Sequence, residues 1–124
     1  MITGLVNSNR EATIRLAVRS PGGRVSEVEA IIDTGFDGFI TLPPALVAAL
    51  GLRRLSRGRA TLANGQEVLF DIYGSTVIWD GVPRHVETDA VDAPPLVGMS
   101  LLHDHELHIH VVDGGRVLIN KAPA

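Results

Sequence analysis

The chain contains no cysteine, so it can form neither a disulfide framework nor a thiolate site. Aromatic residues make up only 4%, and no basic stripe alternates with them, which argues against a nucleic-acid partner. The one basic cluster, "RRLSRGR" at 53–59, is interpreted as a solvated edge strand or loop. No apolar run approaches the roughly 20 residues of a membrane span, and the N-terminus lacks the pattern of a signal peptide. We therefore expect a cytoplasmic protein with no membrane partner.

What the chain does contain is enough apolar sequence for one core. Its 124 residues are 45% apolar, with a mild net charge of −3. That length and composition predict a single folded domain over 1–124 rather than a disordered chain.

Alternating apolar and polar residues predict β-strands along most of the sequence. Ile14, Leu16 and Val18 fall on one face of a strand, and "PGG" at 21–23 turns the chain into a second strand over 24–33. Further short strands are predicted over 37–42, 59–74, 75–89 and 108–121, and at 96–97. The pattern favours an all-β barrel or sandwich.

Turn and helix signals separate these strands. Asn64-Gly65 and Asp80-Gly81 are typical of tight hairpins whose central residues adopt positive φ, and a last turn is expected at 113–115. "PPALVAALGL" at 43–52 predicts a short helix that begins at its prolines and ends at Gly51. A second helical turn is expected after Gly98.

The stretch "AIIDTGFDGFITLP" at 30–43 places an aspartate directly after an apolar strand. Burial disfavours the charged form of a carboxylate, so Asp33 is either a turn residue or a group whose acid–base properties are used. One aspartate cannot both take a proton from water and donate one. Two aspartates that share a proton can, as in the aspartic protease dyad that is the standard example. A second Asp33 requires a second copy of the chain.

The chain resembles the retropepsin-like aspartic proteases, especially a prokaryotic branch in which Phe follows Asp-Thr-Gly. Four motifs match in order and span nearly the whole chain. They are "IIDTGFDGFITLP", the segment "LVAALGL", the "TLANGQ" hairpin that resembles the family's flap, and "PPLVGMSLL". The resemblance implies a closed β-barrel protomer, the acid protease fold, and a homodimer with one shared active site. The terminal strands, 2–7 and 116–120, would build the dimer.

The resemblance also implies roles for individual residues. Asp33 would be the catalytic carboxylate, Thr34 would hydrogen-bond to the partner's matching loop, and Gly35 would place backbone groups near the substrate. The substrate-binding residues would come from the same loop, the flap tip and the segment behind the loop; they are Phe36, Asp37, Ala63, Asn64, Gly65, Val97 and Gly98.

Three features depart from the family pattern. Phe36 replaces a small residue and is expected to narrow the cleft. Met99 stands where retroviral relatives have an arginine that pairs with the residue matching Asp37, so that pairing is absent. The flap is also less rich in glycine than the retroviral flap.

The segment "HDHELHIH" at 103–110 concentrates four histidines. Histidine is a common transition-metal ligand, but the spacing fits no recognised closed site. We interpret it as a polar strand face on which His108 and His110 point the same way, and expect no metal or other cofactor. Tyr73 and Trp79 are expected to pack in the core or at a strand edge.

These observations together predict an aspartic endopeptidase that acts on peptides or proteins. The alternative is a non-catalytic dimeric module of the same fold that binds peptides in its cleft, because fold does not imply function.

Overall fold

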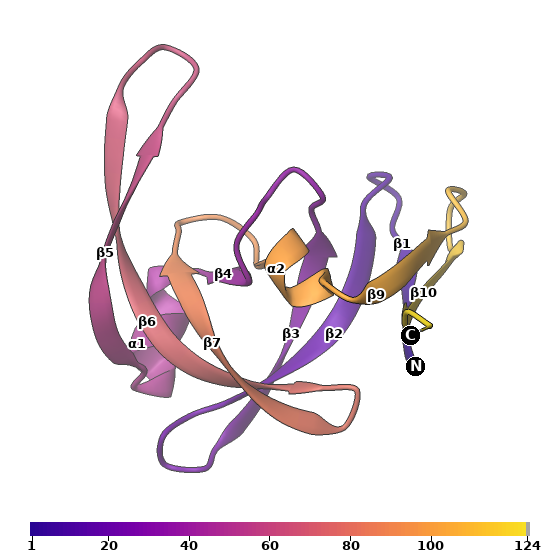
Figure 1. Ribbon diagram of the computed structural model, residues 1–124, viewed down its shortest axis with the longest axis horizontal. Coiled ribbons are helices and arrows are strands. Elements are labelled where there is room, and N and C mark those ends of the chain that lie inside the picture. The colour runs from indigo at the N-terminus through magenta and orange to yellow at the C-terminus, as the bar shows by residue number, and fades with distance from the viewer. Residues whose placement is uncertain (124) are drawn as a thin grey trace.

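The structure is a computed structural model that describes residues 1–123, and it is built mainly of β-strands (Figure 1). The strands are β1 (Ile2–Val6), β2 (Ala12–Arg19), β3 (Val25–Ile32), β4 (Ile40–Leu42), β5 (Arg53–Thr61), β6 (Glu67–Trp79), β7 (Val82–Ala90), β8 (Leu96–Val97), β9 (His105–Ile109) and β10 (Arg116–Lys121). The helices are α1 (Pro44–Leu50) and α2 (Met99–Leu102). The all-β prediction is confirmed. Within residues 1–123, neither helix has the length and apolar character needed to cross a bilayer.

The strands form one mixed ten-stranded sheet in the order β5-β6-β7-β4-β8-β3-β2-β1-β10-β9. β2 also pairs with β6, so β2, β3, β8, β4, β7 and β6 close into a ring. The ring encloses the apolar side chains that alternate along its strands, among them Val18, Ala30, Leu42 and Val77, all fully buried. β8 lies between β3, to which it is parallel, and β4, to which it is antiparallel.

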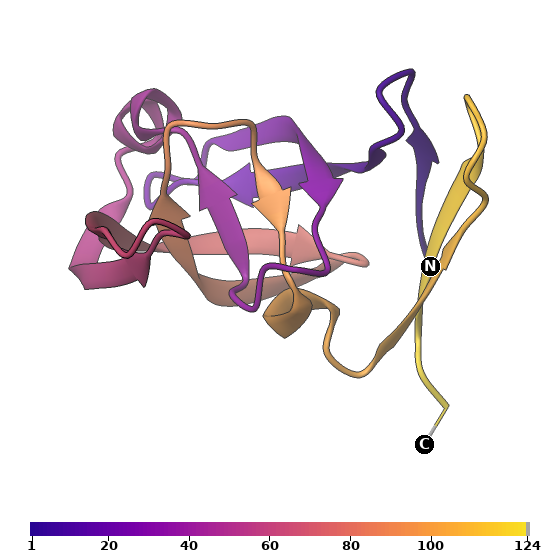
Figure 2. The same ribbon diagram turned by 90° about the horizontal axis from the view of Figure 1, so that it is seen from above.

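Beyond the ring, β1, β10 and β9 continue the sheet as a three-stranded extension, which we call the terminal sheet (Figure 2). β1 pairs with β2 on one side and β10 on the other, and β10 also pairs with β9. Val6, Val117 and Ile119 anchor this extension in the core. The free edge of the terminal sheet is therefore β9, because β1 and β10 have strand partners on both sides.

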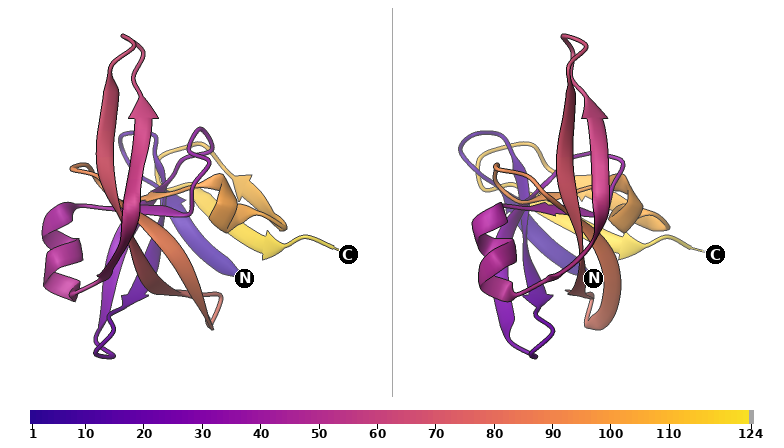
Figure 3. Two further views of the ribbon diagram at one scale, coloured as in Figure 1. Left: turned by 60° about the vertical axis from the view of Figure 1, so that its left-hand side comes forward. Right: turned by 90° about the vertical axis from the view of Figure 1, so that its left-hand side faces the viewer.

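β5 and β6 form a long hairpin that projects from the ring (Figures 1 and 3). β5 contains the basic cluster and is the other edge of the sheet, so the interpretation of 53–59 as a solvated edge is confirmed. The hairpin predicted at Asn64-Gly65 is confirmed, but its turn is wider than a two-residue turn. Gly65 has φ 84°, but Asn64 is not left-handed, and its side-chain Oδ1 accepts a hydrogen bond from the Gln66 N–H at 2.9 Å. The turn thus spans 62–66, closed by the Leu62 N–H on the Gln66 carbonyl.

The other local predictions match the structure more closely. Asp80 and Gly81 both have positive φ, 51° and 79°, as a two-residue hairpin requires. α1 begins after Pro43 and ends at Gly51, whose φ of 63° is the expected left-handed cap. Trp79 is buried, as predicted.

Candidate active site

Asp33 lies directly after β3, where the chain leaves the sheet. Its backbone N–H donates to the Val97 carbonyl of β8 at 2.9 Å, and Ile31 donates to Pro95 at 2.9 Å. Ile32 is buried, Asp33 is half-buried, and Thr34 and Gly35 are exposed. The strand therefore delivers the carboxyl group to the boundary between the core and solvent.

The carboxylate of Asp33 has one hydrogen-bond donor within its own loop. The Gly35 N–H lies 2.9 Å from Asp33 Oδ1, and the Phe36 N–H donates to the Asp33 carbonyl at 3.1 Å. These two bonds form a tight turn directly after the strand. The Asp-Thr-Gly segment thus orients its carboxylate through its own backbone.

The loop between β3 and β4 is held from behind by the segment that links β8 to α2. The Gly98 N–H donates to Phe39 at 2.9 Å, and the Met99 N–H donates to Phe36 at 2.8 Å. The Ser100 side chain also donates its hydroxyl hydrogen to the Asp37 carbonyl. Four consecutive loop positions, 36–39, therefore accept hydrogen bonds from α2 and the residue before it.

Val97 and Gly98 occupy this supporting position. Val97 is 0% exposed, so its side chain supports the loop and lies out of reach of a substrate. A Cβ atom on Gly98 would collide with the Gly38 carbonyl oxygen and would lie 2.5 Å from Phe36 Cδ2. Gly98 is needed because two backbone segments and one ring meet there.

Phe36 packs inward over the glycines of its own loop. A Cβ atom on Gly38 would lie 2.5 Å from Phe36 Cζ and 2.6 Å from Phe36 Cε1. The ring is half-buried. It covers Gly38 and Gly98, and both positions leave room for the ring because they lack a Cβ atom.

The predicted flap residues lie at the tip of the β5–β6 hairpin. Ala63, Asn64 and Gly65 are all exposed. The hairpin and the loop that begins at Asp33 lie on the same side of the molecule (Figures 1 and 3). The sheet therefore places two of the predicted motifs on the same side of the molecule, although about thirty residues separate them along the chain.

Asp37 is exposed and has an acidic neighbour that sequence analysis missed. Asp89 lies on β7, next to Thr41 of β4. Burial raises the pKa of the Asp89 carboxyl, and the negative charges of Glu87 and Asp37 raise it further. The sequence contains no sign of this proximity, because Asp89 comes close to the loop only when β7 pairs with β4 in the folded sheet.

A hollow of about 420 Å³ opens at Asp33 and Thr34. Its other walls include Arg10 and Glu11 at the β1–β2 turn, and Ile109 and Val111 at the end of β9. The terminal sheet therefore borders the candidate site. The sequence had not indicated any of these four wall residues, because they come from turns remote from Asp33 in the chain.

The histidine segment forms no metal cluster in the described part of the chain, where no three His, Cys, Asp or Glu side chains gather around one point. His103 pairs with Asp104 at 3.4 Å and His108 with Glu106 at 3.6 Å, all exposed. His105 differs, because its ring contacts Trp79.

Comparison with known proteins adds no assignment: no family model matches the chain, and no curated protein matches it either.

Proposed function

We propose that the chain is an aspartic endopeptidase of the retropepsin-like, closed-barrel type, active as a homodimer. The observation that supports this most strongly is the Asp33 carboxylate, which accepts the Gly35 N–H at the end of a core strand and opens into a hollow. The projecting hairpin on the same side suits a flap that covers a bound peptide. The closed ring of strands is compatible with the barrel that the resemblance implies.

The homodimer is needed because each chain supplies one Asp-Thr-Gly. Two apolar side chains that line the hollow are exposed: Ile109 is 37% exposed and Val111 65%. Burying such a group against a second copy is favourable, at about 25 cal/mol for each Å² removed from water. Since β1 and β10 are paired within one chain, β9 is the edge available for strand pairing between copies.

The proposed reaction is hydrolysis without a covalent intermediate. One Asp33 carboxylate accepts a proton from a water molecule as the water oxygen attacks the peptide carbonyl carbon. The protonated Asp33 of the second copy donates its proton to the carbonyl oxygen. When the tetrahedral intermediate collapses, the C–N bond breaks and the leaving nitrogen receives a proton from the first carboxyl group. One hydroxyl group of the intermediate gives its proton to the second Asp33 carboxylate, so both carboxyl groups return to their starting protonation states. Closure of the β5–β6 hairpin would exclude bulk water and strengthen these electrostatic interactions.

The test is a digest of a broad peptide library from acidic to neutral pH, with and without a pepstatin-type inhibitor. The Asp33→Asn variant should lose cleavage by at least a hundredfold, because neither copy can then accept the water proton. Glu27→Gln is the matched control: it removes an exposed carboxylate on the same strand and should keep full activity.

Two results would count against the proposal. Full activity of Asp33→Asn would exclude the dyad, and a monomer in sedimentation at all active concentrations would exclude the shared site. Peptide binding without cleavage by a stable dimer would instead support the non-catalytic binding module.

A further inference from the structure

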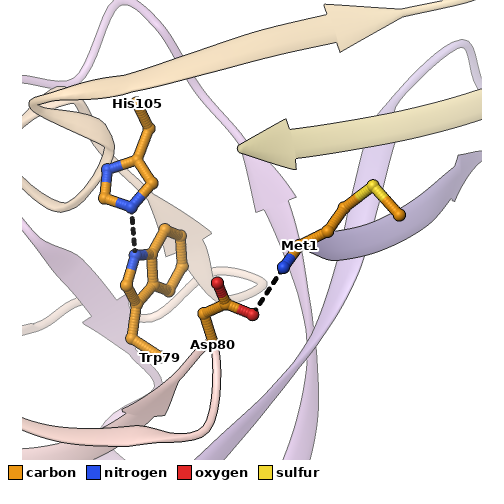
Figure 4. A network of polar contacts seen from close by, with 4 residues as sticks. All are labelled: Met1, Trp79, Asp80 and His105. Carbon is orange, nitrogen blue, oxygen red and sulfur yellow. Dashed lines mark hydrogen bonds and ion pairs between the residues drawn. The ribbon is translucent and has the colours of Figure 1, made fainter. Parts of the chain in front are cut away.

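Trp79, the only tryptophan of the chain, bonds to a histidine in the terminal sheet (Figure 4). It ends β6 in the ring, and His105 begins β9. The indole Nε1 lies 3.1 Å from His105 Nε2, and the rings meet edge to face with their centroids 5.6 Å apart. Trp79 is 3% exposed, so water has little access to this side chain. The contact links two parts of the sheet that are remote in strand order.

The protonation state of His105 follows from its two partners. Its Nδ1 lies 2.9 Å from the His103 carbonyl oxygen, which can only accept, so Nδ1 must hold a hydrogen. The indole N–H can only donate, so Nε2 must offer its lone pair. Both bonds form together only with the neutral imidazole.

The two carboxylates that share a hollow with His105 each have another partner. The hollow beside it, about 340 Å³, has charged or titratable groups from four segments: Asp80, Arg84, His103, Asp104 and Lys121. Asp80 already pairs with the N-terminal ammonium at 2.7 Å (Figure 4), and Asp104 pairs with His103 at 3.4 Å. Arg84 and Lys121 are themselves cations.

The backbone next to His105 is in an unfavourable conformation. Asp104 has φ 66°, in the left-handed region that residues with a side chain rarely adopt. Its carbonyl accepts the Ala122 N–H at 2.8 Å on one side, and the His105 ring is bound to Trp79 on the other. These contacts maintain a strained turn, so loss of one of them favours a change in the turn.

We infer that the Trp79–His105 contact is an acid-sensitive connection between the ring and the terminal sheet. At neutral pH it holds the start of β9 against the end of β6. When Nε2 takes a proton from solvent, its new N–H faces the indole N–H, the hydrogen bond breaks, and the start of β9 is released. The other end of β9 carries Ile109, which lines the hollow at Asp33. The release of β9 does not depend on the proposed peptidase activity. An effect of this release on peptide cleavage would require that activity.

Tryptophan fluorescence tests this directly, since all of the signal comes from Trp79. Titration of the full chain from pH 8 to pH 5 should shift its emission in a single one-proton transition. His105→Gln should abolish the transition, because a glutamine amide oxygen accepts the indole N–H at every pH. His85→Gln is the matched control: His85 is hydrogen-bonded to Thr76, on another part of the sheet, and its loss should leave the transition unchanged.

A second measurement uses the unmodified chain and does not depend on a variant that folds. The single indole N–H resonance should move with the same midpoint as the His105 ring resonances in a pH series of NMR spectra. An indole resonance that stays fixed while His105 titrates would overturn the inference. So would a fluorescence transition that persists in His105→Gln, or emission that does not change between pH 8 and pH 5.

Discussion

Replacing Gly38 with alanine tests how the loop after Asp33 is packed. The new Cβ would lie 2.5 Å and 2.6 Å from two atoms of the Phe36 ring, well inside van der Waals contact. Its nearest obstacles all belong to this one side chain, so the ring must move. Overpacking of this kind costs about 1–3 kcal/mol, and we expect the lower half of that range because the ring is only half-buried. For a chain of this size, each kcal/mol lowers Tm by about 4 °C.

A double-mutant cycle identifies the cause. In a Phe36→Ala background, the Gly38→Ala change should cost less than about 0.5 kcal/mol, because the clashing ring is gone. Gly98→Ala is the contrasting variant. Its Cβ meets the backbone oxygens of Gly38 and Phe36 as well as the ring, so it should cost about 2–3 kcal/mol and be rescued only slightly.

The assay is urea denaturation followed by circular dichroism, with the free energy of unfolding compared at constant slope. Equal rescue of Gly38→Ala and Gly98→Ala by Phe36→Ala would refute the assignment of a backbone collision at Gly98. A Gly38→Ala protein as stable as the parent would show that the ring does not lie over Gly38.

Two further predictions concern polar groups near the same loop, the half-buried Asp89 and the buried Thr41. Asp89→Asn should raise Tm at pH 7. The pKa of Asp89 is raised in the folded state, so its charged carboxylate destabilises the fold at pH values above the unfolded pKa of about 3.9. The gain in Tm should vanish below that pH, and a gain that is constant at all pH values would contradict this cause. Thr41→Val should lower the free energy of unfolding by about 1–2 kcal/mol in urea denaturation, because Thr41 is 4% exposed and its Oγ1 accepts the Leu96 N–H at 3.0 Å. Thr41→Ser keeps the oxygen and should lose much less stability. Equal losses in the two variants would show that the methyl group matters instead.

Local sequence signals identified most of the elements. The strands over 12–19 and 25–32, the helix that ends at Gly51 and the Asp80-Gly81 turn all follow from patterns within a few residues. Asn64-Gly65 resembles Asp80-Gly81 in sequence but forms a wider turn, which spans 62–66. The Asn64 side chain accepts a hydrogen bond from the Gln66 N–H, and this interaction competes with the two-residue turn. The preference of the Asn-Gly dipeptide for tight turns does not show which of the two will form.

The candidate site depends on contacts between segments remote in the chain. Val97 and Gly98 lie behind the loop, as the resemblance implied, because β8 pairs between β3 and β4; the full burial of Val97 there excludes direct contact between its side chain and a substrate. Asp89 became a neighbour of Asp37 because β7 lies beside β4. His105 contacts Trp79 because the terminal sheet folds back toward the end of β6.

Local residue patterns are enough to predict that the chain is all-β, where its strands turn, and that Asp33 stands at the end of an apolar strand followed by a glycine-containing turn. Those properties follow from period-two burial and from the backbone preferences of single residues, which act over a few positions. The folded arrangement is needed to learn which strands close the ring, what supports the Asp33 loop and which groups surround His105. A strand can pair with any segment that matches its hydrogen bonds and its buried face. A short sequence pattern identifies the strand but does not specify which segment pairs with it.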